Sequence, residues 1–168
     1  MAAGARRRAL LIGLALLGFA GASAAQNAAA GKVVLSVTGL VGASADGRVD
    51  FDMARLEALP QRDFTTTSPW YAEPHTFTGP LLRDVLAAAG ARGTKLRAVA
   101  LNDYKIEIPA DDAKQFDVIV ARLMDGKPMP VRDKGPLFII YPFDSSAELR
   151  SERYYSRSAW QLRTIEVR

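Results

Sequence analysis

Apolar residues alternate with polar or small ones over many short stretches of this chain, and a period of two residues is typical of β-strands. The first stretch runs from Val33 to Val37 and is ended by Gly39. A continuously apolar stretch from Leu137 to Tyr141 predicts a buried strand. The same reasoning predicts strands at residues 33–37, 49–51, 63–67, 96–101, 104–108, 118–123 and 137–141, and a final strand that begins at Ser158 or Trp160 and ends at Val167.

One segment has a helical period instead. Apolar side chains recur at 3.6-residue spacing over residues 80–89, with Pro80 at the expected first position and Gly90 just past the end. Shorter helices are expected after Asp52, whose side chain can cap a helix, and within residues 110–116. Many short strands with one main helix predict an α+β fold that is mostly β, with mixed or antiparallel sheets.

The first 24 residues have the pattern of a secretory signal peptide. Three arginines, Arg6 to Arg8, precede a short apolar run, and Ala22-Ser23-Ala24 provides small residues for cleavage. The run is shorter than a bilayer span requires, which favours cleavage over an uncleaved anchor. The paired arginines also partly fit a twin-arginine signal, so either export route is consistent with the sequence. We therefore expect a periplasmic protein with a signal peptide at residues 1–24, a flexible linker at 25–32 and one domain at 33–168.

Most of the basic charge of the chain lies in that leader. The 168 residues include 22 Lys and Arg and 18 Asp and Glu, which gives a formal net charge of +4. Removal of residues 1–24 takes away three arginines and leaves 19 basic against 18 acidic residues. A nearly neutral chain with interspersed signs lacks the basic patch that binds nucleic acid. No second long apolar stretch follows the leader, so the mature protein is expected to be soluble.

The composition excludes several kinds of chemistry. The chain has no Cys and a single His, at position 75. It therefore offers no thiolate nucleophile, no disulfide, no cysteine ligand for zinc or molybdenum, and no histidine cluster for a metal. Glycine-rich nucleotide-binding motifs are also absent from the sequence. We accordingly predict neither catalytic residues nor a metal site.

Two loops carry side chains suited to a flat heterocyclic ligand. Trp70 follows a proline in a polar stretch, so it is either a plug over the end of the sheet or a stacking platform for a ring. Asn102, Asp103 and Tyr104 lie between two predicted strands and are typical of a turn. They also bring an amide, a carboxylate and a phenol to one end of the sheet. A carboxylate such as Asp103 can accept two parallel N–H bonds from an amidine-like edge, which pterins and guanines present.

A third loop has basic character. Arg132 and Lys134 precede Gly135-Pro136, and basic groups with backbone amides at such a turn suit an anion. A solvated charged turn has the same composition, so both interpretations stay open. The loop leads into the apolar strand that ends at Tyr141.

The order of these segments resembles the sulfite-oxidase-fold family, whose members bind molybdopterin. No single segment is diagnostic, but together they span nearly all of residues 33–167. The matching segments are residues 35–39, 56–60, 65–70, 77–86, 100–104, 108–109, 125–126, 134–136, 141–142 and 160–167. The resemblance implies a sulfite-oxidase-like fold with a pterin-shaped pocket.

The chain departs from the enzymes of that family in one feature. Those enzymes bind molybdenum through a Cys thiolate in the loop that aligns with residues 65–70, where this chain has only Thr, Ser, Pro and Trp. Hydroxyl groups replace a thiolate poorly as ligands of that metal. The change argues against oxidase or reductase activity and leaves the pterin pocket available.

The Cys-less version is similar to periplasmic pterin-responsive regulators. These bind a reduced pterin and contact the periplasmic sensor domain of a membrane enzyme that makes or degrades cyclic di-GMP, and so affect biofilm formation. The resemblance places Trp70 and the loop Asn102-Asp103-Tyr104 at the ligand. We expect Trp70 to stack on the ring, Asp103 to hold its amino-pyrimidine edge, and residues 68–75 to reorder on binding. The full set of predicted ligand-binding residues is Thr67, Trp70, Asn102, Asp103, Tyr104, Lys134 and Tyr141.

The leading hypothesis is thus a non-catalytic regulator that binds a reduced pterin and no molybdenum. A second hypothesis is a molybdopterin-dependent oxidoreductase with an unusual set of metal ligands. A third is a domain with an empty pocket that serves only for contacts with other proteins.

Overall fold

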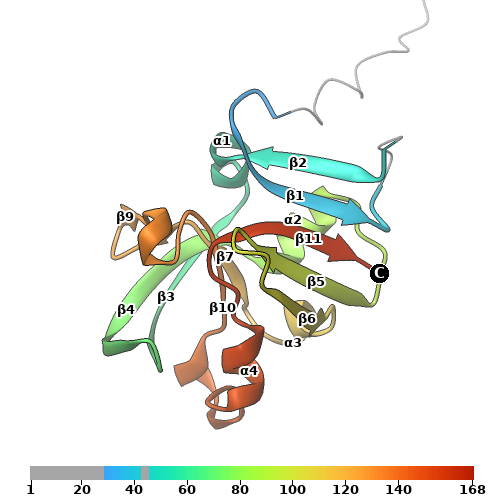
Figure 1. Cartoon of the computed structure of the whole chain (residues 1–168). Helices are drawn as coiled ribbons and strands as arrows, with labels where there is room; N and C mark the ends of the chain where they lie inside the picture. Colours follow the sequence, from blue (N-terminus) through green and yellow to red (C-terminus); the bar gives the residue numbers. More distant parts are fainter. Residues whose placement is uncertain (1–28, 43–45) are drawn as a thin grey trace, which may run out of the picture.

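A five-stranded mixed sheet forms the centre of the molecule (Figure 1). The computed structural model describes residues 29–42 and 46–168. Strand β1 pairs in parallel with β11, and the other neighbours in this sheet are antiparallel, which confirms the predicted mixed sheet. The strand order is β2 (Arg48–Asp52), β1 (Val33–Gly39), β11 (Leu162–Val167), β5 (Lys95–Ala100) and β6 (Lys105–Pro109).

The alternation of apolar and polar residues in the sequence correctly predicts where the strands of this sheet lie in the chain. In β1, Leu35 and Val37 are fully buried, as the period of two residues requires. In β11 the buried residues Leu162 and Ile165 are three apart, because the pairing with β5 shifts between Leu162 and Thr164. Such an irregularity adds a residue to one strand and lets both apolar side chains face the core.

A long antiparallel hairpin extends away from the central sheet (Figure 1). Its strands are β3 (Gln61–Ser68) and β4 (Tyr71–Pro80), and the four-stranded order is completed by β8 (Leu123–Met124) and β9 (Lys127–Pro128). A separate two-stranded sheet pairs β7 (Ile119–Ala121) with β10 (Phe138–Ile140). The predicted single strand at residues 118–123 is therefore divided between two sheets.

The segment 68–75, expected to be a loop that reorders, is mostly strand. The pairing of β3 with β4 includes Thr66 with His75 and Ser68 with Tyr71, so only Pro69 and Trp70 form the turn. Polar side chains dominate the first half of β4 and hide its period. Its extended conformation comes from pairing with β3 rather than from its own hydrophobic pattern.

The helices are short: α1 (Met53–Glu57), α2 (Leu82–Ala88), α3 (Asp112–Gln115) and α4 (Glu152–Arg157), with 3₁₀ turns η2 (Val131–Asp133), η3 (Phe143–Ser145) and η4 (Ala147–Leu149). The Asp52 cap is confirmed, because its carboxylate accepts the Arg55 backbone N–H at 2.8 Å. Gly90 past the main helix is also confirmed, with a φ of 63°. The placement of Pro80 is wrong: it ends β4, and Leu81 caps α2.

Helix α4 was not predicted from the sequence. Its residues Glu-Arg-Tyr-Tyr-Ser-Arg bury only Tyr154, so they lack the apolar stripe that marks a helix. The predicted signal peptide and residues 25–28 of the predicted linker lie outside the described residues. The remaining linker residues precede β1, and there the Gly31 backbone N–H donates to Asp52 at 2.7 Å. Within the described ranges, no helix has the length and apolar character needed to cross a membrane.

Candidate ligand-binding cavity

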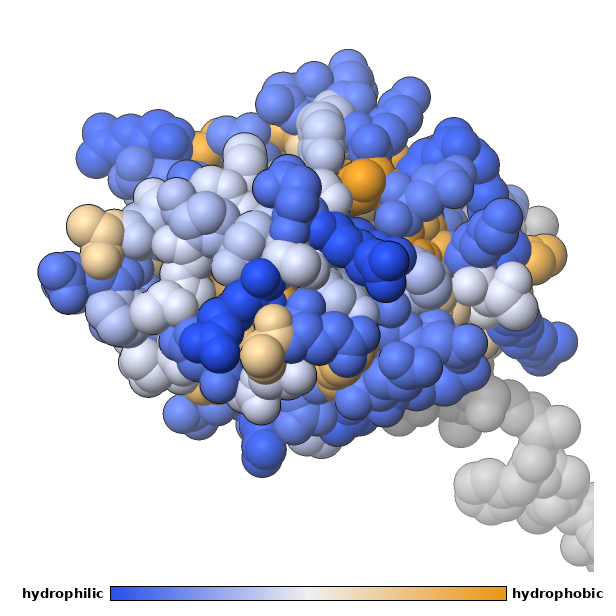
Figure 2. Space-filling view, turned by 90° about the horizontal axis from the view of Figure 1, so that it is seen from below, coloured by the Kyte–Doolittle hydropathy of each residue, from blue (hydrophilic) through white to orange (hydrophobic). Residues whose placement is uncertain are grey.

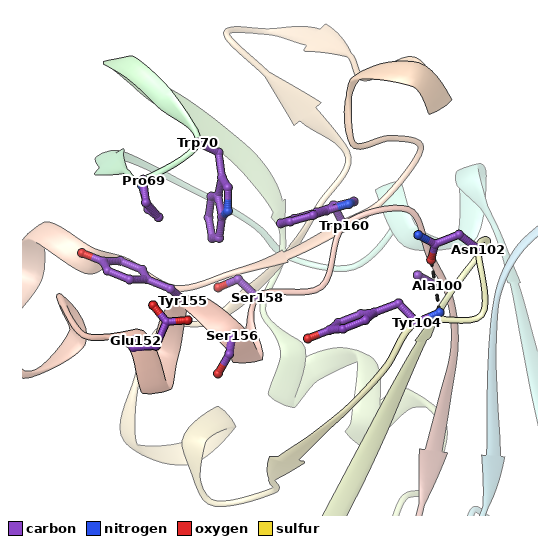
Figure 3. Close-up of a pocket in the computed structure, with 10 residues that line it drawn as sticks. All are labelled: Pro69, Trp70, Ala100, Asn102, Tyr104, Glu152, Tyr155, Ser156, Ser158 and Trp160. Carbon is purple, nitrogen blue, oxygen red and sulfur yellow. Dashed lines mark hydrogen bonds between the residues drawn. The ribbon is translucent and has the colours of Figure 1, made fainter.

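Three parts of the chain that are distant in the sequence meet around one cavity of about 480 Å³ (Figure 3). They are the tip of the β3–β4 hairpin, the β5–β6 turn, and helix α4 with the residues that lead from it into β11. The lining residues are Pro69, Trp70, Ala100, Asn102, Tyr104, Glu152, Tyr155, Ser156, Ser158 and Trp160. A volume of this size is in the range of small-molecule sites.

The walls of the cavity are mainly aromatic. Trp70 meets Trp160 edge to face, with ring centroids 5.5 Å apart, and meets Tyr155 at 6.2 Å. Tyr104 closes the side formed by the β5–β6 turn (Figure 3). Behind the cavity, Trp70 also packs on Phe138 at 5.6 Å. The same ring therefore covers the core and lines the cavity, and its role as a stacking platform for a ligand stays a prediction.

The turn 102–104 divides its side chains between the cavity and the solvent. Asn102 and Tyr104 line the cavity, and the Asn102 side-chain oxygen accepts the Tyr104 backbone N–H at 3.2 Å. Asp103 does not line it. Its backbone is left-handed, with a φ of 63°, and its carboxylate pairs with Arg163 at 2.9 Å. The Asp103 side chain is 75% exposed, so the proposed contact of Asp103 with a ring edge is not supported by its position.

Thr67 holds the hairpin tip rather than lining the cavity. Its backbone N–H and its hydroxyl both donate to the Asp144 carboxylate, at 2.6 and 2.7 Å. These bonds, first from the backbone and then from the hydroxyl, lower the pKa of Asp144. The strand β3 is thereby attached to η3 just before the turn that carries Trp70.

Tyr141 is a core residue and does not reach the cavity. Its ring is fully buried, and its hydroxyl donates to Asp112 at 2.7 Å. Arg157 also donates to Asp112, at 2.8 Å. Burial and this hydrogen bond raise the pKa of the Tyr141 hydroxyl. The network attaches the last residue of α4 to α3.

Lys134 lies at a second cavity, of about 370 Å³. Its ammonium is 5.0 Å from the ring centroid of Tyr71 and 5.1 Å from that of Trp160. Such cation–π contacts hold a lysine above aromatic faces. Lys134 thus contacts Trp160, one wall of the aromatic cavity, while it lines a different site. The Tyr71 hydroxyl is buried, and in the described part of the chain it has no hydrogen-bond partner.

Seven of the ten lining residues are not in the predicted set: Pro69, Ala100 and five residues on or just after α4. Glu152, Tyr155 and Ser156 lie on α4, and Ser158 and Trp160 follow that helix. One signal was available: Tyr155 and Trp160 are large aromatic residues in a stretch otherwise rich in Ser, Arg and Glu. Large aromatic side chains with a polar tip in such a stretch are suited to a binding surface.

The matching family model is that of the oxidoreductase molybdopterin binding domain, over residues 23–147. The chain belongs to this family. The match ends before α4, so Glu152 and Trp160 lie beyond the matched part of this molybdopterin-binding domain. A comparison with curated proteins finds no match.

The residues of the cavity suit part of the cofactor of this family. Aromatic walls suit a flat pterin ring. The chain has no Cys, so it offers no thiolate ligand for the molybdenum of that cofactor. Hydroxyl groups in the loop 65–70 are engaged within the protein: Thr65 bonds to Thr76 at 2.7 Å, and Thr66 accepts the Asp144 backbone N–H at 3.1 Å. The described residues that line the cavity include no Lys or Arg that could bind the phosphate of molybdopterin. The site fits the ring but neither the metal nor the phosphate.

Proposed function

We propose that this protein is an exported, non-catalytic domain that binds a free reduced pterin in the aromatic cavity. The observation that carries the proposal is a cavity of about 480 Å³ with four aromatic walls, Trp70, Tyr104, Tyr155 and Trp160, in a chain without Cys. Stacking of a ring on an aromatic side chain contributes about 1–3 kcal/mol. Together with hydrogen bonds to the ring edge, this is enough for micromolar binding.

The proposed output is control of a membrane-bound enzyme. The similarity to pterin-responsive regulators supports a partner in the periplasmic sensor domain of a cyclase or phosphodiesterase of cyclic di-GMP. Pterin would act by favouring one state of this complex, since a ligand shifts an equilibrium only through its different affinity for the two states.

The face on which α4 lies is polar, with apolar residues only in small separate spots (Figure 2). Such a surface suits a reversible contact, because non-obligate interfaces are no more apolar than the rest of a protein surface.

Calorimetric titration of the mature protein with tetrahydropterin tests the ligand. We expect a micromolar Kd and a loss of about 5- to 150-fold in Trp70→Ala, which corresponds to one stacking contact. Trp70 also packs on the core, so Tyr104→Ala is the second variant; Tyr104 is 49% exposed, and its loss costs the fold less. The control is Leu40→Ala, at an exposed residue that does not line the cavity. Unchanged affinity in both cavity variants would remove the aromatic walls from the site.

Family membership favours a second candidate, a molybdenum-dependent oxidoreductase with unusual ligands. Metal analysis of the protein purified from its native host separates the two functions. The regulator contains no stoichiometric molybdenum, whereas one molybdenum per chain would establish the enzyme.

A further inference from the structure

Among the described residues that line the aromatic cavity, Glu152 is the only charged one. It occupies the first turn of α4, and Ser156 lies one turn further on the same side of this helix. Within residues 29–42 and 46–168, no hydrogen bond or ion pair engages the Glu152 carboxylate. Its two oxygens are therefore available as acceptors at the cavity wall.

The other carboxylates close to this region are already engaged. Asp103 pairs with Arg163 at 2.9 Å, outside the cavity. Asp112 accepts from both Tyr141 and Arg157 inside the protein. In the part of the chain that the structure describes, Glu152 is thus the one carboxylate that lines the cavity.

The opposite side of the cavity presents a donor. The side-chain oxygen of Asn102 is used by the Tyr104 backbone N–H, which leaves the amide NH₂ to donate. In Figure 3, Glu152 lies beside Tyr155 and Asn102 beside Tyr104, with aromatic rings between them. The cavity therefore combines flat walls, an anionic acceptor at one side and a neutral donor at the other.

We propose that Glu152 is the residue that determines ligand specificity, by accepting two N–H bonds from the amino-pyrimidine edge of the bound ring. The inference rests on the proposed function and replaces Asp103 in the role first expected for it. A carboxylate binds such an edge in two parallel, charge-assisted hydrogen bonds, which are stronger than bonds between neutral groups. The ligands selected are neutral or cationic flat rings with a 2-amino group. Anionic rings and rings with a second carbonyl in that position are disfavoured, because lone pairs or charges of the same sign face the carboxylate.

The test compares two ligands on two proteins by calorimetry. The ligands are tetrahydropterin and its 2,4-dioxo counterpart, which lacks the 2-amino group, and the proteins are the mature chain and Glu152→Gln. We expect the unaltered protein to prefer tetrahydropterin by at least tenfold. Glu152→Gln should weaken tetrahydropterin binding by about 10- to 100-fold and leave binding of the dioxo ring unchanged or stronger, because the repulsion between its carbonyl and the carboxylate is removed. The ratio of the two ligand affinities, compared between the two proteins, isolates the contact with the 2-amino edge, because any general effect on the cavity acts on both ligands.

Asp103→Asn is the matched control, since an Asn tolerates the left-handed backbone at that turn and the side chain lies outside the cavity. It should leave both affinities within twofold of the unaltered protein. An equal loss of both ligands in Glu152→Gln, or no loss of either, overturns the role of Glu152. If the unaltered protein binds neither ring, the proposed pterin-binding function itself fails. If Asp103→Asn alone abolishes the preference, the carboxylate of the turn is the specificity residue instead.

Discussion

Trp70 contacts two environments at once, and this explains how a single residue can join a binding cavity to the core. Part of its ring contacts Trp160 and Tyr155 in the cavity wall, and another part packs on Phe138. Edge-to-face contacts of this kind hold a ring in a defined orientation. A ligand that stacks on Trp70 therefore meets a surface that is already ordered, which lowers the entropy lost on binding.

Substitution of Tyr141 distinguishes an effect on the stability of the core from an effect on ligand binding. In Tyr141→Phe the hydroxyl bonded to Asp112 is lost, while Arg157 keeps its own bond to that carboxylate. We expect the free energy of unfolding, measured in urea, to fall by about 1.5–3 kcal/mol, the usual contribution of one hydrogen bond to a charged group. Pterin affinity should stay within twofold, because Tyr141 does not line the cavity. A large loss of affinity at unchanged stability would return Tyr141 to the site.

At the scale of elements, the β3–β4 hairpin depends on a link outside its own strands. The Thr67 backbone and hydroxyl donate to Asp144 in η3, and the Asp144 backbone N–H donates to the Thr66 hydroxyl. Three hydrogen bonds thus fix β3 just before the turn that presents Trp70. The position of one cavity wall therefore depends on the ionisation of Asp144.

This link predicts a pH dependence of stability. The pKa of Asp144 is lowered in the folded protein, mainly by the Thr67 backbone N–H. A carboxylate with a lowered pKa stabilises the fold above its unfolded value, about 4, and that contribution is lost as the pH falls through the folded value. We expect Asp144→Asn to lower the melting temperature at pH 7, and the difference from the unaltered protein to narrow below pH ~4.

The matched control for this experiment is Asp63→Asn, at an exposed carboxylate for which the described part of the chain provides no hydrogen bond or ion pair. Thermal unfolding followed by circular dichroism at both pH values gives the comparison. The role of the Asp144 charge would be contradicted if the melting temperatures of Asp144→Asn and the unaltered protein differed by the same amount at pH 7 and at pH 3.

The elements that the sequence predicts are those with a local signal. Strand β1 is marked by alternating apolar residues. Asp52 marks the start of α1 as its capping residue, and Gly90 marks the end of α2 because it adopts a left-handed backbone. The start of β4 and the whole of α4 have no such signal. Tyr71 to His75 are extended because they pair with β3, and α4 is held by the Arg157 contact with Asp112. The first contact is the local pairing of a hairpin and the second joins residues 45 positions apart, and the hydrophobic period reveals neither.

At the scale of the whole molecule, the cavity is a product of the topology. It lies where the hairpin tip, the β5–β6 turn and α4 converge. Trp70, Asn102 and Tyr104 could be selected from the sequence because their turns are exceptional in composition. Tyr155 and Trp160 have only a weak signal, as large aromatic residues in a polar stretch, and Glu152 has none, because these residues join the cavity only after α4 docks against the core. For the same reason the sequence points to the carboxylate of Asp103 rather than to one on α4.

A ligand that bridges these three parts should stabilise the whole fold. At a free concentration of one hundred times Kd, binding to the native state alone adds about 2.7 kcal/mol to the free energy of unfolding. For a domain of this size the melting temperature should rise by about 5–10 °C. Differential scanning calorimetry with tetrahydropterin measures the rise, and Trp70→Ala at the same ligand concentration should show a smaller one. A melting temperature unaffected by saturating pterin would contradict binding to the native fold.

The most direct test of the pterin site uses the tryptophans themselves. The chain has two Trp residues, Trp70 and Trp160, and both line the cavity. All of the tryptophan emission of the protein therefore comes from the walls of the proposed site. Titration of the mature protein with tetrahydropterin, corrected for absorbance by the ligand, should change this emission in a saturable way with a Kd in the micromolar range. Emission that shows no saturable change up to millimolar pterin would contradict the assignment of the cavity as a pterin site.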